Sequence, residues 1–365
     1  MTADTVGGVW TYALELTRAL QPYDVEVLLA IMGPSLSASQ RDDARSLPNL
    51  SLFKSNYKLE WMPDCWSDVK HAGNWLLHLE NRLQPDLIHL NGYAHANLPL
   101  QNPTLVAGHS CVYSWWHAVR GETPPAEWQR YKTEVQNGLH AADLVVTPSA
   151  AMLRALQTHY GPIENARVIH NGRDTEQFTP LRKRPMILSA GRLWDEAKNI
   201  DRLVEIAAEL PWPVLIAGES QHRDQRESFA ARQCRWLGSL PASQLRHWYA
   251  SASIYALPAL YEPFGYTPLE AALSGCALVL GRIESLREIW GDAAVFVDPK
   301  DGKALRHELL ELICNQQRRD EMSKRARARA LEFTSARMAE NYVAAYEELL
   351  ATKAFAKQEE FARCA

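Results

Sequence analysis

The sequence predicts an α/β protein with two parallel-sheet domains, each with its own core. Its 365 residues, 47% of them hydrophobic, exceed what one ordinary domain needs. Short apolar runs typical of strands alternate with amphipathic stretches typical of helices along the whole chain. This alternation favours strand–helix–strand units, whose ligands bind at the carboxyl ends of the strands.

The first half of the chain carries the pattern of one such domain. Strands are predicted at residues 25–31, 87–90, 105–107 and 144–147. Helices are predicted at residues 8–20, 70–83, 127–140 and 150–159. Only six residues precede the glycine turn at Gly7 and Gly8. Either the chain begins a few residues late, or the sheet tolerates a clipped first strand.

The second half repeats the alternation. Strands are predicted at residues 186–189, 214–217, 236–237, 254–257, 277–280 and 294–297. Residues 175–185, with two prolines, are the expected linker between the domains. Apolar residues at helical spacing between Thr334 and Leu349 predict a C-terminal helix with Thr334 as its N-cap.

Composition narrows the class of protein. The formal net charge of −4 argues against nucleic acid as the main partner. The cysteines show no C-x-x-C pair or metal-ligand spacing, which indicates free thiols in a reducing compartment. The sequence has neither a signal peptide nor an apolar run of about 18 residues, so we expect a cytoplasmic protein without a transmembrane segment.

The residues from Glu262 to Glu270 carry the most specific chemistry. Seven residues separate the two glutamates, and a strand-like run precedes them. Gly265 is predicted to turn the chain into a helix, since Pro268 is well tolerated in a first turn. A helix start binds phosphate through free N–H groups and the positive end of its dipole. Ionised glutamates accept hydrogen bonds from vicinal diols, so the combination predicts a nucleotide-sugar site.

A second loop, residues 190–199, supplies positive charge. It follows the predicted strand 186–189 and contains Arg192 and Lys198. The planar guanidinium and the lysine point charge together suit a diphosphate. Taken alone, both are ordinary surface cations, because Arg and Lys are usually exposed.

Together these motifs resemble those of the retaining glycosyltransferases of family 4, which have the GT-B fold. The paired-glutamate pattern matches Glu262 and Glu270, and the Gly-Arg…Lys-Asn loop matches residues 191–199. Weaker matches follow in the family's order, at Gly7-Gly8, Gly108-His109-Ser110 and Asn171-Gly172-Arg173-Asp174.

The resemblance implies two Rossmann-like domains that face each other across a deep cleft. Residues 1–174 would form the acceptor-side domain and residues 175–333 the nucleotide-sugar-binding domain. Residues 334–365 would form a helix that crosses back to the first domain.

The resemblance also implies roles for the donor-site residues. Glu270 is expected to hold the ribose diol and Glu262 the hydroxyls of the donor sugar. Arg192 and Lys198 are expected to neutralise the departing diphosphate. The remaining donor-binding candidates are Gly7, Gly8, Gly191, Phe264, Gly265, Tyr266 and Thr267. No Asp-x-Asp pair stands beside a predicted strand end, so neither a metal nor a cofactor is expected.

Further candidates lie in the first half of the chain. His109 follows the predicted strand 105–107, and the resemblance implies that it lies at the donor sugar, for positioning first and for acid–base chemistry second. Trp115 and Trp116 would offer flat apolar faces to an acceptor sugar, or would pack in the core. Asn91 and His95 follow the predicted strand 87–90 and are further acceptor candidates.

One segment departs from the family pattern. Ser285-Leu-Arg-Glu288 stands where many relatives have Gly-Leu-Pro-Glu. The change is expected at the donor loop, and the sequence does not indicate its consequence.

The predicted function is transfer of a hexose-type sugar from a nucleoside-diphosphate sugar to an acceptor hydroxyl, with retention and without a metal. A carbohydrate, a lipid and a small molecule all remain open as acceptors. One alternative is a sugar-nucleotide epimerase or hydrolase of the same fold, which would need no acceptor surface at Trp115 and Trp116. A non-catalytic nucleotide-sugar-binding module is the second. A dinucleotide oxidoreductase would need G-x-G-x-x-G at the first turn, which the sequence lacks.

Overall fold

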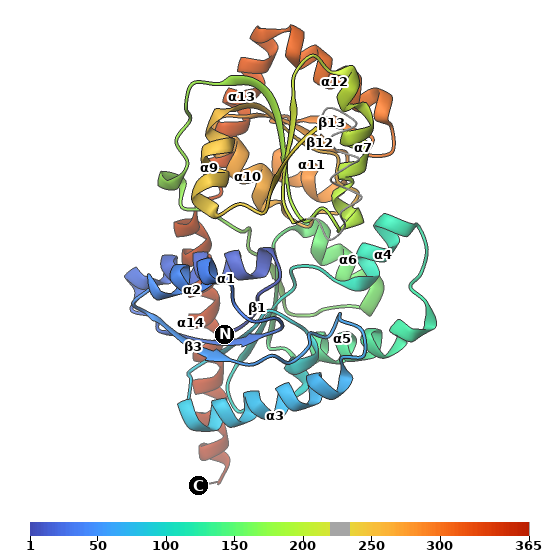
Figure 1. Cartoon of the computed structure of the whole chain (residues 1–365). Helices are drawn as coiled ribbons and strands as arrows, with labels where there is room; N and C mark the ends of the chain where they lie inside the picture. The colour runs from blue at the N-terminus through green and yellow to red at the C-terminus, as the bar shows by residue number, and fades with distance from the viewer. Residues whose placement is uncertain (220–233, 365) are drawn as a thin grey trace. The chain divides into compact units, whose positions relative to one another are not determined.

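The computed structural model describes residues 1–219 and 234–364, which divide into two compact units (Figure 1). Unit 1 comprises residues 1–117, 122–170 and 335 to the C-terminus, and unit 2 comprises residues 118–121 and 171–334. The chain passes from unit 1 into unit 2 between His170 and Asn171, so the expected boundary after Asp174 lies within unit 2.

Unit 1 contains two parallel ladders. Strands β1 (Thr2–Asp4), β2 (Val27–Met32) and β3 (Leu50–Lys54) pair in the order β1-β2-β3. Strands β4 (Ile88–Leu90), β5 (Thr104–Ala107), β6 (Leu144–Thr147) and β7 (Ala166–Val168) pair in the order β4-β5-β6-β7. The ladders meet at β1 and β4, where the Asn91 N–H donates to Thr2 Oγ1 at 2.9 Å. The residues before the glycine turn thus form a short first strand of three residues.

Helices pack against these strands. They are α1 (Gly8–Leu20), α2 (Ala38–Arg45), α3 (Trp66–Leu83), α4 (Val112–Arg120), α5 (Gln129–Ala141), α6 (Ala150–Tyr160) and α14 (Ser335–Cys364). The last three residues of α4 group with unit 2. The C-terminal helix α14 packs on α1, where the rings of Tyr342 and Tyr12 lie 6.0 Å apart. The helix predicted to cross back thus belongs to unit 1.

Unit 2 is built on one six-stranded parallel sheet. Its strands, in the order β10-β9-β8-β11-β12-β13, are β10 (Cys234–Gly238), β9 (Val214–Ala217), β8 (Arg184–Ala190), β11 (Ala252–Leu257), β12 (Ala277–Gly281) and β13 (Val295–Val297). The order reverses between β8 and β11, as in doubly wound nucleotide-binding sheets, and ligands bind at such a reversal. The central strand β11 is buried over its whole length, in keeping with its largely apolar sequence.

Helices flank both faces of this sheet (Figure 1). They are α7 (Ile200–Ile206), α9 (Ala242–Ser251), α10 (Tyr266–Leu273), α11 (Glu284–Trp290), α12 (Gly302–Cys314) and α13 (Gln316–Ala330). The segment expected as a linker, residues 175–185, packs inside unit 2 instead: Phe178 is buried, and Lys183 Nζ donates to the Ser274 carbonyl at 2.6 Å.

Two expectations from composition concern cysteines and membranes. Cys65 and Cys276 are buried free thiols, and Cys314 is an exposed one. The side chain of Cys364 lies outside the described residues. Across the described parts of the chain, each helix is too short or too polar to cross a bilayer.

Candidate functional site

The loop after β11 turns sharply into α10, as the sequence predicts. Gly265 has φ 95°, and a Cβ there would lie 2.7 Å from Pro268 Cγ, so only glycine fits this turn. The Tyr255 hydroxyl lies 2.7 Å from Thr267 Oγ1 and 3.1 Å from the Ala190 carbonyl. Tyr255 therefore ties the first turn of α10 to the end of β8.

Lys198 and Glu262, both predicted as catalytic, are in direct contact. Lys198 Nζ lies 2.5 Å from Glu262 Oε2, and the side chains are only 15% and 13% exposed. The alkyl stem of Lys198 lies over Gly191, where a Cβ would come within 3.6 Å of it. A short charge-assisted hydrogen bond of this kind is strong in a partly buried site.

Backbone contacts hold the two loops together. The Leu260 N–H donates to the Ala197 carbonyl at 2.8 Å. Asn199, which has φ 53°, donates from Nδ2 to the carbonyls of Pro258 (2.8 Å) and Pro299 (2.7 Å). Asn199 thus fixes the position of Lys198 next to it, a role that its place in the family motif does not reveal.

Arg192 points along its own loop. Its Nη2 lies 2.9 Å from Asp195 Oδ2, and its guanidinium lies 5.1 Å from the centre of the Trp194 ring. Asp195 is buried and also accepts the Ala197 N–H, whereas the Arg192 side chain is 37% exposed. Arg192 is therefore anchored at one edge and reachable by a ligand at the other.

Glu270, the second member of the glutamate pair, lies beside Arg173. Arg173 Nε is 3.1 Å from Glu270 Oε1, with both side chains about nine-tenths buried. Sequence reasoning assigned Arg173 only to a motif at mid-chain. No sequence signal links two residues so far apart in the chain.

Ser285 is a further residue whose role the sequence does not reveal. Its hydroxyl is buried and donates to the Glu262 carbonyl at 2.6 Å. A glycine at this position would have no side chain to make this bond. Ser285 therefore anchors the loop that carries Glu262.

In unit 1, His109 lies at the end of β5, as expected. Its Nε2 is 2.8 Å from Asn91 Oδ1, while Asn91 Nδ2 donates to the Thr2 carbonyl at 2.7 Å. Since the amide nitrogen is used by Thr2, the amide oxygen faces His109 and Nε2 carries the proton. Burial lowers the pKa of His109 to about 4. The ring also packs edge-on against Tyr12, with centroids 4.3 Å apart. His109 is therefore a neutral imidazole with a fixed tautomer.

The other candidates in unit 1 lie in three places. Gly7, the N-cap of α1, has φ 87°, so its backbone conformation favours glycine, while a Cβ on Gly8 would meet nothing within 4 Å. Trp115 and Trp116 are half-buried, with ring centroids 6.0 Å apart. His95 is buried, and its Nε2 donates to the Val69 carbonyl of α3 at 3.0 Å. This bond commits His95 to packing between η2 (Ala94–Asn97) and α3.

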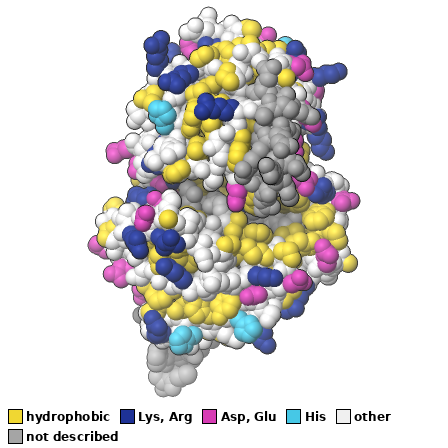
Figure 2. Space-filling view, in the orientation of Figure 1, with side chains coloured by type: hydrophobic (Ala, Val, Ile, Leu, Met, Phe, Trp, Pro, Cys, Tyr) yellow, Lys and Arg dark blue, Asp and Glu magenta, His cyan; other side chains and the backbone are white. Residues whose placement is uncertain are grey.

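Apolar side chains also reach the surface of unit 1. Figure 2 shows a band of hydrophobic side chains across its visible face. The Trp116 ring, which contacts Trp115, also packs near the Trp128 ring, with the centroids of Trp116 and Trp128 6.4 Å apart. Trp116 thus packs within an aromatic row.

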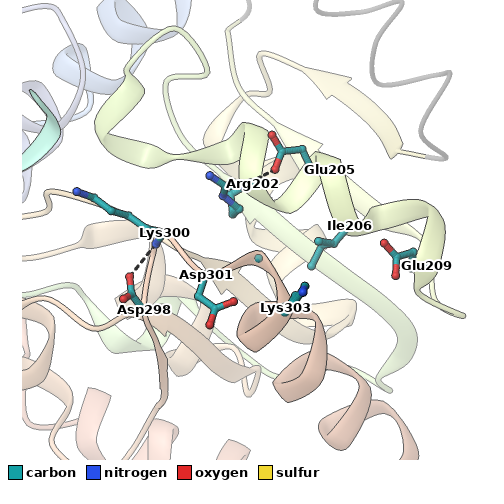
Figure 3. Close-up of a pocket in the computed structure, with 9 residues that line it drawn as sticks. Arg202, Glu205, Ile206, Glu209, Asp298, Lys300, Asp301 and Lys303 are labelled. Carbon is teal, nitrogen blue, oxygen red and sulfur yellow. Dashed lines mark hydrogen bonds and ion pairs between the residues drawn. The ribbon is translucent and has the colours of Figure 1, made fainter.

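A pocket of about 540 Å³ lies elsewhere on unit 2 (Figure 3). Charged residues of α7 and α12 and of the loop before α12 line it, and Arg202 forms an ion pair with Glu205 at 2.7 Å. None of the predicted site residues is among the described residues that line it. The described residues also contain no group of three or more His, Cys, Asp or Glu side chains placed to hold a metal ion.

Two family models match the chain. The model for Glycosyltransferase Family 4 matches residues 6–177, and the model for Glycosyl transferases group 1 matches residues 172–329. A glycogen synthase of Mycobacterium tuberculosis is 30% identical over 270 residues, which cover 69% of this chain. The chain spans only 60% of the length of that synthase.

Solved structures share the fold. Sucrose-phosphate synthase from Thermosynechococcus elongatus superposes with a TM-score of 0.81 at 18% identity, covering 96% of each chain. Anabaena HepE, solved in complex with UDP-glucose, gives a TM-score of 0.75 at 16% identity, covering 96% of this chain and 98% of HepE. At these identities the likeness establishes the GT-B architecture.

Proposed function

Because this chain belongs to the family 4 glycosyltransferases with the GT-B fold, we propose that it is a metal-independent retaining hexosyltransferase. Its donor would be a nucleoside-diphosphate sugar and its acceptor a hydroxyl group. Carbohydrate, lipid and small-molecule acceptors all fit this proposal.

The contact between Lys198 and Glu262 beside the start of α10 carries the proposal. One group suits a diphosphate and the other suits sugar hydroxyls, and they lie 2.5 Å apart. A nucleotide-sugar is the ligand that presents both kinds of group next to each other. The N–H groups of the first turn of α10 add phosphate donors, since α10 begins at Tyr266 directly after Gly265.

The ion pairs of the site indicate how its charged side chains would rearrange when a donor binds. Lys198 is paired with Glu262, and Arg192 is paired with Asp195. An incoming diphosphate would draw Lys198 toward itself, and the Glu262 carboxylate would then accept hydrogen bonds from the sugar. Glu270 would hold the ribose hydroxyls.

In the transfer step, the bond between the anomeric carbon and the diphosphate oxygen breaks. The acceptor oxygen bonds to the same carbon on the same face, and its proton passes to the leaving diphosphate. Arg192 and Lys198 would stabilise the charge that develops on the leaving group. Asp195 and Asn199 hold in place the loop from which both side chains would reach the diphosphate.

His109 would position the donor sugar. As a neutral ring with its proton on Nε2 toward Asn91, it carries its lone pair on Nδ1. The neutral ring can therefore accept a hydrogen bond from a sugar hydroxyl at Nδ1, which an imidazolium cation could not do. The proposal therefore gives His109 a positioning role first.

We also propose a cytoplasmic location. The free thiols at Cys65 and Cys276 support it, because a reducing compartment keeps cysteines out of disulfides.

Thermal unfolding with UDP, GDP, ADP, dTDP and CMP tests the donor site. A specific nucleotide at a hundred times its dissociation constant adds about 2.7 kcal/mol of stability. Since HepE is solved with UDP-glucose, UDP is the first probe. We expect one nucleoside diphosphate to raise the melting temperature, and we expect Arg192→Ala to abolish the shift. No shift with any nucleotide would contradict the proposal.

A further inference from the structure

The ion pair between Arg173 and Glu270 joins the glutamate motif to a residue far outside it. Arg173 belongs to unit 2, where Nε lies 3.1 Å from Glu270 Oε1. The side chains are 9% and 11% exposed, so the pair is largely withdrawn from water. A buried charge pair of this kind persists only when its geometry is well held.

Backbone and side chain both fix Arg173. Its N–H donates to the Phe333 carbonyl at 3.0 Å, and Arg173 and Thr334 form an isolated parallel bridge. Its guanidinium lies over two rings, 5.3 Å from the centre of Phe178 and 5.9 Å from the centre of Tyr266. A planar guanidinium stacked on aromatic faces has little rotational freedom. Arg173 is therefore a rigid counter-charge that Glu270 meets in one orientation.

The partner of that counter-charge is the group proposed to hold ribose. A carboxylate with so little exposure loses much of its hydration, which disfavours the ionised form unless a cation faces it. Only the ionised, correctly turned carboxylate accepts hydrogen bonds from both hydroxyls of a vicinal diol. We propose that Arg173 is a positioning residue that sets the ribose specificity of the donor site by holding the Glu270 carboxylate. This inference rests on the proposed function of Glu270.

The proposal makes a prediction for sugars that lack a hydroxyl. A ribonucleotide presents two adjacent hydroxyls to Glu270, and a 2′-deoxyribonucleotide presents one. A hydrogen bond to a charged group is strong enough to give about a tenfold to hundredfold preference for the ribonucleotide. That preference should depend on Arg173, although Arg173 itself would not touch the nucleotide.

Calorimetric titration of the full chain with UDP, 2′-deoxy-UDP and inorganic pyrophosphate tests this role. If the thermal screen identifies another base, its ribo and deoxyribo diphosphates replace the uridine pair. In Arg173→Met we expect the preference for the ribonucleotide to fall below about threefold. Affinity for pyrophosphate, which has no ribose, should stay within about twofold of wild type. A merely structural role would weaken both ligands together.

Arg319→Met is the matched control. Arg319 lies in unit 2 with its guanidinium 5.0 Å from the centre of the Trp212 ring, and it donates to the Leu312 carbonyl. The control should keep the ribonucleotide preference of wild type. If Arg173→Met does not fold, Arg173→Lys decides, because it keeps the charge and loses the planar fork; there too the preference should drop.

The outcomes separate the two proposals. A wild-type preference that survives in Arg173→Met or Arg173→Lys would overturn the role of Arg173 and leave the donor site standing. Equal loss of UDP and pyrophosphate affinity would also overturn it. A wild-type protein that binds pyrophosphate but no nucleoside diphosphate would instead contradict the proposed function.

Discussion

The two units hold their candidate residues by opposite means. In unit 2 the candidates are charged and held by ion pairs, at Lys198–Glu262, Arg192–Asp195 and Arg173–Glu270. In unit 1 the central candidate, His109, is neutral and held by a hydrogen bond to Asn91. Buried charges need counter-charges, whereas a neutral ring needs only hydrogen-bond partners.

The difference matches the chemistry proposed for each side. A diphosphate donor is strongly anionic, so cations held ready by carboxylates suit unit 2. A sugar ring is neutral and rich in hydroxyls, so an uncharged hydrogen-bond acceptor such as the His109 imidazole suits unit 1. Unit 2 should therefore be sensitive to removal of charge, and unit 1 to gain of charge.

The largest expected effect comes from the clamp in unit 2. Lys198→Met should lower the rate of sugar transfer by about 10²–10³, by analogy with the loss of one preorganised transition-state donor. Steady-state kinetics with the donor identified by the thermal screen measure it. Lys300→Met is the matched control, since Lys300 is an exposed cation of the same unit beside the unrelated cavity. A loss below tenfold, or an equal loss in the control, would contradict a charge-based donor site.

The next effect is that of acid on the free energy of unfolding, through His109 of unit 1. Burial lowers the pKa of His109 to about 4 in the folded chain, whereas an unperturbed histidine, as in the unfolded chain, has a pKa of 6.5. Between these values the unfolded chain binds a proton that the folded chain does not, so the free energy of unfolding falls as pH decreases from 6.5 to 4. The loss from this group is at most about 3 kcal/mol. Above pH 6.5 it contributes no such dependence.

Urea unfolding at pH 7 and at pH 4.5 measures this loss. His109→Gln should show a smaller loss of stability on acidification than wild type. His140→Gln, a change at an exposed histidine of unit 1, should behave as wild type does. An unchanged acid sensitivity in His109→Gln would mean that His109 is not held neutral.

A third prediction concerns the far end of α10. Lys183 Nζ donates to the Ser274 and Tyr249 carbonyls at 2.6 and 3.2 Å, and burial lowers its pKa. Lys183→Met should reduce the free energy of unfolding by about 1–3 kcal/mol, since the Ser274 carbonyl at the end of α10 loses this donor. Lys324→Met, at an exposed site on α13, should change little. Equal stability of the two variants in urea would show that this anchor does not stabilise unit 2.

The smallest effect sharpens the role of Ser285. Ser285→Ala removes the hydroxyl that donates to the Glu262 carbonyl, and it should raise the donor KM about twofold to tenfold. Ser323→Ala removes a similar bond, to the Gly275 carbonyl at 2.8 Å, away from Glu262. The donor KM should rise in the first variant alone. A rise in both would point to a general loosening of unit 2.

The contrast between the units also shows what sequence can predict. The strand–glycine–helix turn at Gly265 and the loop with Lys198 have local signals, and the structure has both. Strand β3 is half-exposed and β7 has no fully buried residue, so neither gives the apolar run that identifies a strand. The apolar pattern of the last helix stops near Leu349, although α14 continues to Cys364.

Contacts between residues far apart in the chain could not be predicted from the sequence. Arg173 and Glu270 meet because Arg173 bonds to the Phe333 carbonyl just after α13, and α13 packs against α10. Ser285 reaches Glu262 because α11 follows the adjacent strand β12. Such pairs depend on strand order, which periodicity does not encode.

Titration calorimetry of a nucleoside diphosphate into wild type, Lys198→Met and His109→Gln tests the central claim most directly. If the charged residues of unit 2 hold the nucleotide, Lys198→Met should weaken binding at least about tenfold, as loss of a charge-assisted contact does. His109→Gln should bind the nucleotide as wild type does, because His109 is assigned to the sugar. Wild-type affinity in Lys198→Met, with binding lost in His109→Gln, would contradict the account.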